Sequence, residues 1–479
     1  MRGQRTRASR GCGGHAVVIG GSMAGLAAAA ALARHFDQVT VIERDRLPSG
    51  PALRKGVPQG RHIHVLLTAG QRALERLFPD YRADLIAAGA VTIRLPKDIL
   101  WLGSVGWNPR GPGAHQLLSC SRGLMDWTAR CHLPAMGNVE FLDGAKVTDL
   151  LVDRTGSTVI GVRADIRGLG DRVVTKEVRA DLIIDASGRG TRSPQWLESL
   201  GYGRPAETRI DARLGYASRC YAIPDGLTAD WRGIKLQPLP PAMLRSGSLI
   251  PIEGQRWLVS LHGAGGDYPP TDEAGFREFA RSLRSPVLYE AIKAAQPLSP
   301  IYGSRATVNR WWHYHAMPRW PERFVVLGDA AYAFNPIYGQ GMSVAGLMGA
   351  ALDDCLREWR RGEDLTGFAR RFQRRVARAG ADAWLVSTRE DLQHSTATGV
   401  RMSAKSRAMH RYMNRVAAVA TVAPQVNRAF VAVLNLQAPA ASLLWPSVAL
   451  RTLRAVAHPR SAPHTPREAL AAPAMSGKR

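Results

Sequence analysis

The stretch from Ala16 to Asp45, AVVIGGSMAGLAAAAALARHFDQVTVIERD, most constrains what this chain can fold into. Its first four residues form an apolar, β-branched run that is typical of a buried parallel strand, and Leu26 to Ala33 are strong helix formers. Glycines separate the two segments, because a tight turn from strand to helix needs small residues where the backbone approaches a ligand. The stretch therefore predicts an α/β fold that begins with a Rossmann-like unit.

The same stretch predicts a dinucleotide site. Backbone amides at the start of a helix bind a pyrophosphate, and Glu43 ends the next strand about 20 residues later, where a carboxylate can accept ribose hydroxyls. Serine occupies the position of the middle glycine, so an ordinary tight turn of an α/β domain stays an alternative. The expected site residues in this stretch are Gly20, Gly21, Ser22, Met23, Ala24, Gly25 and Glu43.

A second motif, FVVLGDAAYAFNPIYGQGMSVAGLMGAALDD from Phe324 to Asp354, repeats this pattern near the other end of the chain. A short apolar strand ends at Gly328, a loop with proline and glycine follows, and a small-residue helix leaves it. Asp329 can accept a hydrogen bond from a sugar-like hydroxyl. The amides of the 339–342 segment can face a developing anion at a helix N-terminus.

Together the two motifs resemble the flavoprotein monooxygenases with the para-hydroxybenzoate hydroxylase fold. The resemblance implies FAD as the cofactor, with Asp329 at its ribityl chain and Arg44 beside the adenosine. It also implies a backbone contact from Val147 to the adenine and an approach of Arg122 from a helix start. The residues it places at the pyrimidine side of the flavin ring are Pro336, Gly339, Gln340, Gly341 and Met342.

Longer segments, among them SCSRGLMDW, DLIIDASGRGTRSPQWLESLGY and GPALRKGVPQGRHIHVLLTAGQRALERLFP, resemble the flavin-dependent epoxidases of polyether antibiotic pathways. These enzymes are distant relatives of styrene monooxygenase. The resemblance implies that an apolar, alkene-bearing natural-product intermediate is epoxidised or hydroxylated with dioxygen through a flavin hydroperoxide. Such chemistry needs no protein base, so no catalytic residue is assigned. Arg54 becomes a candidate to contact FAD or to hold a mobile flavin ring, with a solvated loop arginine as the alternative.

One difference from the related hydroxylases concerns the electron donor. Hydroxylases that take hydride directly from NADPH carry Asp-Gly-x-x-Ser-x-x-Arg in mid-chain. Here Ser187 stands in place of the aspartate and Pro194 in place of the arginine. We therefore expect a separate flavin reductase as the source of electrons.

The pattern of strands and helices predicts six segments. Residues 15–212 and 321–364 form the FAD-binding domain, and residues 213–320 form an antiparallel-sheet substrate domain with a hairpin turn at Glu253-Gly254. Residues 365–457 are helical, with proline breaks. The basic tail 1–14 and the tail 458–479 are expected to be disordered. Candidate aromatic residues for the substrate pocket, each of which could instead lie in the core, are Tyr216, Tyr221, Trp257, Trp311 and Trp312.

Composition limits the partners. The net charge of +25 comes mainly from dispersed arginine without a nucleic-acid-binding motif, so no nucleic-acid partner is expected. Five scattered cysteines indicate neither a disulfide framework nor a zinc site and fit a cytoplasmic protein. His62 and His64 lack a third ligand nearby, so no metal is expected. The helices near the C-terminus favour packing on the body, and contact with a membrane surface stays open.

The sequence leaves three alternatives to an epoxidase or hydroxylase. A flavin halogenase would share the fold, but its Trp-x-Trp-x-Ile-Pro signature is absent from the sequence. A prenyl-type reductase on the same fold would remove double bonds without oxygen uptake. A carrier of lipids that has lost its cofactor would suit the basic surface, but the intact Glu43, Asp329 and glycine turns argue against it.

Overall fold

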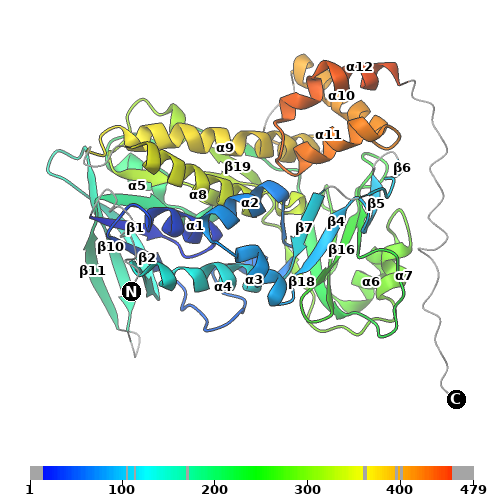
Figure 1. Cartoon of the computed structure of the whole chain (residues 1–479), viewed down its shortest axis with the longest axis horizontal. Coiled ribbons are helices and arrows are strands. Elements are labelled where there is room, and N and C mark those ends of the chain that lie inside the picture. Colours follow the sequence, from blue (N-terminus) through cyan, green and yellow to red (C-terminus); the bar gives the residue numbers. More distant parts are fainter. Residues whose placement is uncertain are drawn as a thin grey trace, which may run out of the picture.

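The computed structural model describes residues 14–103, 106–112, 115–168, 172–359, 364–393, 397–399 and 403–455. A parallel sheet with helices packed on it forms one end of an elongated molecule, and a large mostly antiparallel sheet forms the other (Figure 1). The two expected tails lie outside the described residues, except for Gly14.

The first sheet is the Rossmann-like one. Its five strands run in the order β20-β12-β1-β2-β8, and each adjacent pair of strands is parallel. The strands are β1 (His15–Ile19), β2 (Gln38–Glu43), β8 (Val139–Asp143), β12 (Leu182–Asp185) and β20 (Phe324–Val326). Because β20 pairs with β12, the second motif of the sequence is built into the same sheet as the first.

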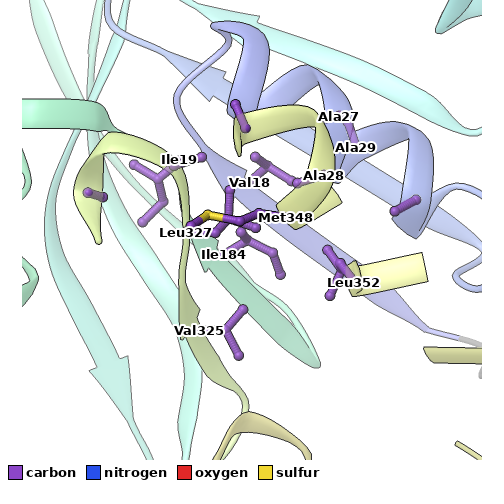
Figure 2. Packing of buried hydrophobic residues seen from close by; sticks show 14 of the residues in the cluster. Val18, Ile19, Ala27, Ala28, Ala29, Ile184, Val325, Leu327, Met348 and Leu352 are labelled. Carbon is purple, nitrogen blue, oxygen red and sulfur yellow. The ribbon is translucent and has the colours of Figure 1, made fainter. Parts of the chain in front are cut away.

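Helix α1 (Met23–Leu32) and helix α8 (Gly341–Glu358) pack together over this sheet. A Cβ atom added to Gly349 would lie 2.6 Å from the Cβ of Ala27, so the two helices approach through small residues. Figure 2 shows Met348 and Leu352 of α8 in the same buried cluster as Val18 of β1 and the alanines of α1. The alanine-rich sequence of α1 therefore permits the close packing that joins the two motifs.

The second large sheet is mostly antiparallel, as expected for residues 213–320, and we call it the substrate sheet after the role predicted for that segment. Its order is β18-β14-β17-β16-β15-β5-β6, and the hairpin turn predicted at Glu253-Gly254 is confirmed by the pairing of β16 with β17. Strands β5 and β6 lie outside the 213–320 segment that the sequence predicts for this sheet. A division of the chain into consecutive segments cannot show that these two earlier strands join it. The strands are β5 (Ile99–Gly103), β6 (Gly106–Trp107), β14 (Gly215–Ala222), β15 (Gly233–Leu236), β16 (Ser246–Ile252), β17 (Arg256–Gly263) and β18 (Tyr302–Ser304).

Three small sheets connect these parts, in the orders β11-β10-β9, β13-β19-β21 and β3-β7-β4. Their strands are β3 (Val65–Leu66), β4 (Val91–Leu95), β7 (His115–Ser119), β9 (Ala145–Val152), β10 (Val159–Arg167), β11 (Val173–Arg179), β13 (Glu207–Ile210), β19 (Asn309–Trp312) and β21 (Tyr332–Ala333). The helices that cover the sheets are α2 (Thr68–Leu77), α3 (Tyr81–Ala87), α4 (Arg122–His132), α5 (Ser193–Ser199), α6 (Glu273–Arg281) and α7 (Val287–Ile292).

The region after residue 364 is helical, as the sequence predicts. Prolines mark its boundaries, because Pro424 and Pro446 each occupy the first position of a helix, where a missing N–H costs nothing. The helices are α9 (Phe368–Asp391), α10 (Ala404–Ala420), α11 (Pro424–Leu434) and α12 (Pro446–Arg454). Within the described part of the chain, no helix combines the length and apolar character that crossing a membrane requires.

Candidate functional site

A cavity of about 470 Å³ lies where the two large sheets and α8 meet. Most of the residues predicted from the sequence line it, although they come from segments about 300 positions apart. Gly21, Gly25, Arg54 and Gln340 are predicted site residues that do not line it. Those that do are Gly20, Ser22, Met23, Ala24, Glu43, Arg44, Arg122, Val147, Asp329, Pro336, Gly339, Gly341 and Met342.

The first turn is too tight to carry side chains at its glycines. Gly20 has a φ of +103°, and a Cβ there would lie 2.6 Å from the carbonyl oxygen of Ala186. A Cβ on Gly25 would lie only 1.7 Å from the carbonyl oxygen of Gly20. The backbone is therefore bare where α1 begins, which leaves its N-terminal amides open toward the cavity.

Ser22, which replaces the middle glycine of the pattern, has a specific partner. Arg122, at the start of α4, donates from Nη2 to the Ser22 hydroxyl at 2.6 Å and from Nε to Asp126 at 2.9 Å. Both Ser22 and Arg122 line the cavity. The Arg122 guanidinium therefore lies next to the turn, where it could contact an anionic phosphate. This position agrees with the contact between Arg122 and the cofactor that the resemblance implies.

Glu43 is a buried carboxylate that accepts two backbone hydrogen bonds. Gly21 donates to its Oε2 at 2.7 Å and Asp45 to its Oε1 at 3.0 Å. Arg54 lies behind it, with Nη1 3.1 Å from Oε2 and Nη2 donating to the carbonyl of Gly21 at 3.1 Å. The Arg54 side chain is only 4 % exposed and does not line the cavity. Besides the Gly21 carbonyl, it contacts the carboxylates of Glu43, Asp45 and Asp126.

We expect Arg54→Met to lower the free energy of unfolding by roughly 3 kcal/mol, because buried carboxylates would lose their counter-charge. The loss should be as large without FAD as with it, and chemical denaturation of both forms measures it. Arg46→Met is the matched control, since Arg46 pairs with Asp143 at the surface and should change stability by less than about 1 kcal/mol. A loss seen only with FAD bound would instead assign Arg54 to the cofactor.

The second turn meets the first. A Cβ on Gly328 would lie 2.5 Å from the Cβ of Ala24, so the two loops are in direct contact. Asp329 follows at the cavity wall, with Arg189 Nε 3.8 Å from its Oδ2. Burial raises the pKa of Asp329, and Arg189 partly offsets that effect. The two motifs therefore converge on one cavity, as the sequence predicts.

The loop between Asp329 and α8 is anchored by Asp391, a fully buried carboxylate at the end of α9. Asn335 donates to it at 3.0 Å, Tyr338 at 2.6 Å and Asn309 at 2.5 Å. The three hydrogen bonds favour the ionised form, but burial outweighs them and raises the pKa of Asp391 to about 7. Asp391 thus fixes the turn that carries Pro336 and Gly339 into the cavity.

The substrate sheet supplies the opposite wall through Tyr216 and Tyr302, joined by two histidines that precede β3. His62 Nδ1 lies 2.8 Å from the Ser218 hydroxyl, and its ring packs edge-on against Tyr216. Burial lowers the pKa of His62 to about 4 and that of His64 to about 3. Both imidazoles are therefore neutral at pH 7.

Several lining residues were not assigned from the sequence. Arg189 and Tyr302 lie in the cavity wall, and their only sequence signal was proximity to recognised segments. Of the five aromatic candidates, only Tyr216 lines the cavity. The other four pack in or against hydrophobic clusters, which confirms the core alternative for Tyr221, Trp257, Trp311 and Trp312.

Comparison with known proteins agrees with this geometry. A family model for an NAD(P)-binding Rossmann-like domain matches residues 18–79. The chain is 35% identical to Protein Rv3254 of Mycobacterium tuberculosis over 392 residues, which cover 80% of this chain and 81% of that protein. It is 28% identical to a kynurenine 3-monooxygenase of Salinispora arenicola over 359 residues, 71% of this chain and 72% of the relative.

Among solved structures, that of the flavin-dependent brominase Bmp2 matches with a TM-score of 0.62 at 17% identity, covering 88% of this chain and 93% of that one. The bare turn at Gly20 and Gly25, Arg122 beside it, and Asp329 at the same cavity provide groups that fit the pyrophosphate and sugar parts of FAD. The chain belongs to the family of Protein Rv3254, and it is an oxidoreductase with the fold of the FAD-dependent monooxygenases.

Proposed function

We propose that this protein is a FAD-dependent monooxygenase that adds one oxygen atom of dioxygen to an alkene-bearing natural-product intermediate, forming an epoxide or an alcohol. The observation that carries the proposal is the shared cavity. Its lining includes both glycine turns, whose groups fit FAD. It also includes Tyr216 and Tyr302 of the substrate sheet, and His62, which packs against Tyr216. Kynurenine 3-monooxygenase, a relative of similar length, supports the same reaction class.

FAD, when reduced and bound, supplies the oxygen atom from dioxygen. The protein's part is to bind, orient and exclude water. The N-terminus of α8, with the amides of Gly341 and Met342, would stabilise negative charge on the ring through the positive end of the helix. Neutral His62 and His64 would line the reaction space without adding a charge that attracts water.

We further propose that a separate flavin reductase supplies the electrons. The loop after β12 lacks the aspartate and arginine typical of enzymes that use NADPH directly, and Asp185 is fully occupied within that loop. It accepts hydrogen bonds from the Ser187 amide at 2.8 Å and the Thr191 hydroxyl at 2.5 Å, and also from Ser193. Reduction of bound FAD by NADPH alone should therefore be slow, and adding a flavin reductase should accelerate it.

The test uses purified holoenzyme, a flavin reductase, NADH and an olefinic polyketide under ¹⁸O-labelled dioxygen. Mass spectrometry should find a product that has gained one labelled oxygen atom. A parallel reaction with bromide tests the alternative that the protein is a halogenase, which its structural similarity to the brominase Bmp2 suggests. Bromine incorporation would replace the proposal, and peroxide without product across a panel of alkenes would refute it.

We also propose that the C-terminal helices touch an anionic membrane surface. Trp445 and Leu453 are each 59% exposed, and Arg451 and Arg454 lie in the last turn of α12. An apolar face flanked by cations suits the interface of such a membrane.

For this contact, we expect the protein to sediment with phosphatidylglycerol vesicles and not with phosphatidylcholine vesicles, and Trp445→Ser to weaken sedimentation several-fold. Val173→Ser is the matched control, because Val173 is 58% exposed on β11 in a different part of the structure. Equal sedimentation of wild type and Trp445→Ser would contradict the proposal.

A further inference from the structure

We infer that the substrate carries a carboxylate, and that Lys235 and Trp101 on the substrate sheet bind it. This inference rests on the proposed function, because the sheet that bears these residues also forms a wall of the oxygenation cavity. It adds an acidic group to the apolar, alkene-bearing substrate expected from the sequence.

The register of the sheet places a polar row across five neighbouring strands. Ser218 is paired with Ser260, Ser260 with Ser248, and Ser248 with Lys235. Paired residues of neighbouring strands project on the same face, and Ser218 contacts the cavity residue His62 through its hydroxyl. The row, from the cavity outward, is Ser218, Ser260, Ser248, Lys235 and Trp101.

The outer end of the row presents donors without acceptors. Trp101 Nε1 is buried and has no hydrogen-bond partner. The Lys235 side chain is half-buried, and its ammonium forms no hydrogen bond or ion pair among the described residues. The ammonium lies over the Trp101 ring, 5.5 Å from its centroid. A buried donor without a partner costs free energy, so the Trp101 N–H is matched by an acceptor that arrives with a ligand, and the neighbouring Lys235 ammonium is free to pair with the same ligand.

The nearby acidic residue does not fill this role. Glu390 acts on Lys235 electrostatically, but its own oxygens are engaged by Arg389 Nη1 at 2.6 Å and Gln393 Nε2 at 3.0 Å. Burial lowers the pKa of Lys235, and a bound anion would restore it. The Lys235 ammonium over the indole ring and the N–H of that ring are two donors on neighbouring residues, which suits the two oxygens of a carboxylate.

The spacing of the strands sets the length of the ligand. Neighbouring strands lie about 4.8 Å apart, so Ser218 and Lys235 are separated by roughly 14 Å across the sheet. A substrate that reaches both ends of the row is therefore extended, with its acid remote from the atoms that are oxygenated. Ser260 is buried and hydrogen-bonds to Ser218, so between the ends of the row only the half-buried Ser248 hydroxyl can pair with a carbonyl or hydroxyl group of the ligand.

Equilibrium binding to the FAD-loaded enzyme tests the inference without turnover, so it can fail while the oxygenation result stands. Isothermal titration with 6-phenylhexanoate and with 6-phenylhexanamide compares an acid with its neutral amide. We expect wild type to bind the acid about tenfold more tightly, as charge-assisted hydrogen bonds imply. Lys235→Met should abolish that preference and Lys235→Arg should retain it.

Lys176→Met is the matched control, because Lys176 is exposed on β11 outside the substrate sheet, and it should leave the preference intact. Unfolding temperature and FAD content show whether each variant is folded and loaded. Equal affinity of wild type for acid and amide, including no binding of either, would overturn the inference. So would an acid preference that survives in Lys235→Met.

Discussion

Gly25→Ala enzyme is expected to purify with little or no bound FAD. The added methyl group would lie 1.7 Å from the carbonyl oxygen of Gly20, a backbone atom that cannot turn aside as a flexible side chain can. The turn must shift, and the amides at the start of α1 shift with it. Strain of about 3 kcal/mol, the upper range for overpacking, corresponds to a loss of FAD affinity of roughly 100-fold. Flavin absorbance after dialysis, followed by titration of the apoprotein with FAD, measures the loss.

Gly50→Ala is the matched control for this variant. A Cβ there meets nothing within 4 Å, so FAD content and affinity should stay at the wild-type level. The unfolding temperature of each apoprotein separates a local effect on the turn from general destabilisation. If Gly25→Ala retained FAD with wild-type affinity, the turn would not be the pyrophosphate site.

The second large effect is expected at Asp391. Asp391→Ala would leave donors of Asn309, Asn335 and Tyr338 buried without an acceptor. At 1 kcal/mol or more for each, the free energy of unfolding should fall by about 3 kcal/mol. The loop that carries Pro336 and Gly339 would also lose its anchor, so FAD should bind more weakly. Urea unfolding and FAD titration measure the two effects.

The pH dependence of Asp391 provides a second readout. Its pKa is about 7 in the fold against an ordinary value of 3.8, so between these values the folded protein holds a proton that the unfolded chain has released. Its contribution to stability is therefore present near pH 4 and is lost as the pH rises through 7. Asp391→Asn cannot titrate, so wild type should lose stability relative to this variant from pH 4 to 7. A constant difference across that range would contradict the raised pKa.

The parts of the site that the sequence could predict are those formed by local pattern. The strand, turn, helix and terminal acid of residues 16–43 follow from burial and from the space a ligand needs, and the second motif repeats that logic. Both turns line one cavity. Arg44, Arg122 and Val147, inferred by resemblance, line it as well.

The parts that could not be predicted depend on how distant segments meet. Trp101 belongs to β5, which joins the substrate sheet by a parallel pairing with β15 that no local periodicity signals. Arg54 occurs in a loop, and its burial against Glu43 becomes visible only when α4 brings Asp126 to the same place. In the sequence nothing distinguishes Asp391 from other acidic residues at helix ends, because its hydrogen bonds with Asn309 and Asn335 form only in the folded structure.

The pairing of β20 with β12 also bears on how the protein is made. A ribosome completes the first glycine turn early, but the other half of the proposed FAD site, from Asp329 to Met342, emerges only after about seven tenths of the chain has been synthesised. A nascent chain cannot hold the flavin before that point. Products truncated ahead of α8 would expose the alanine surface of α1 and become targets for chaperones and proteases.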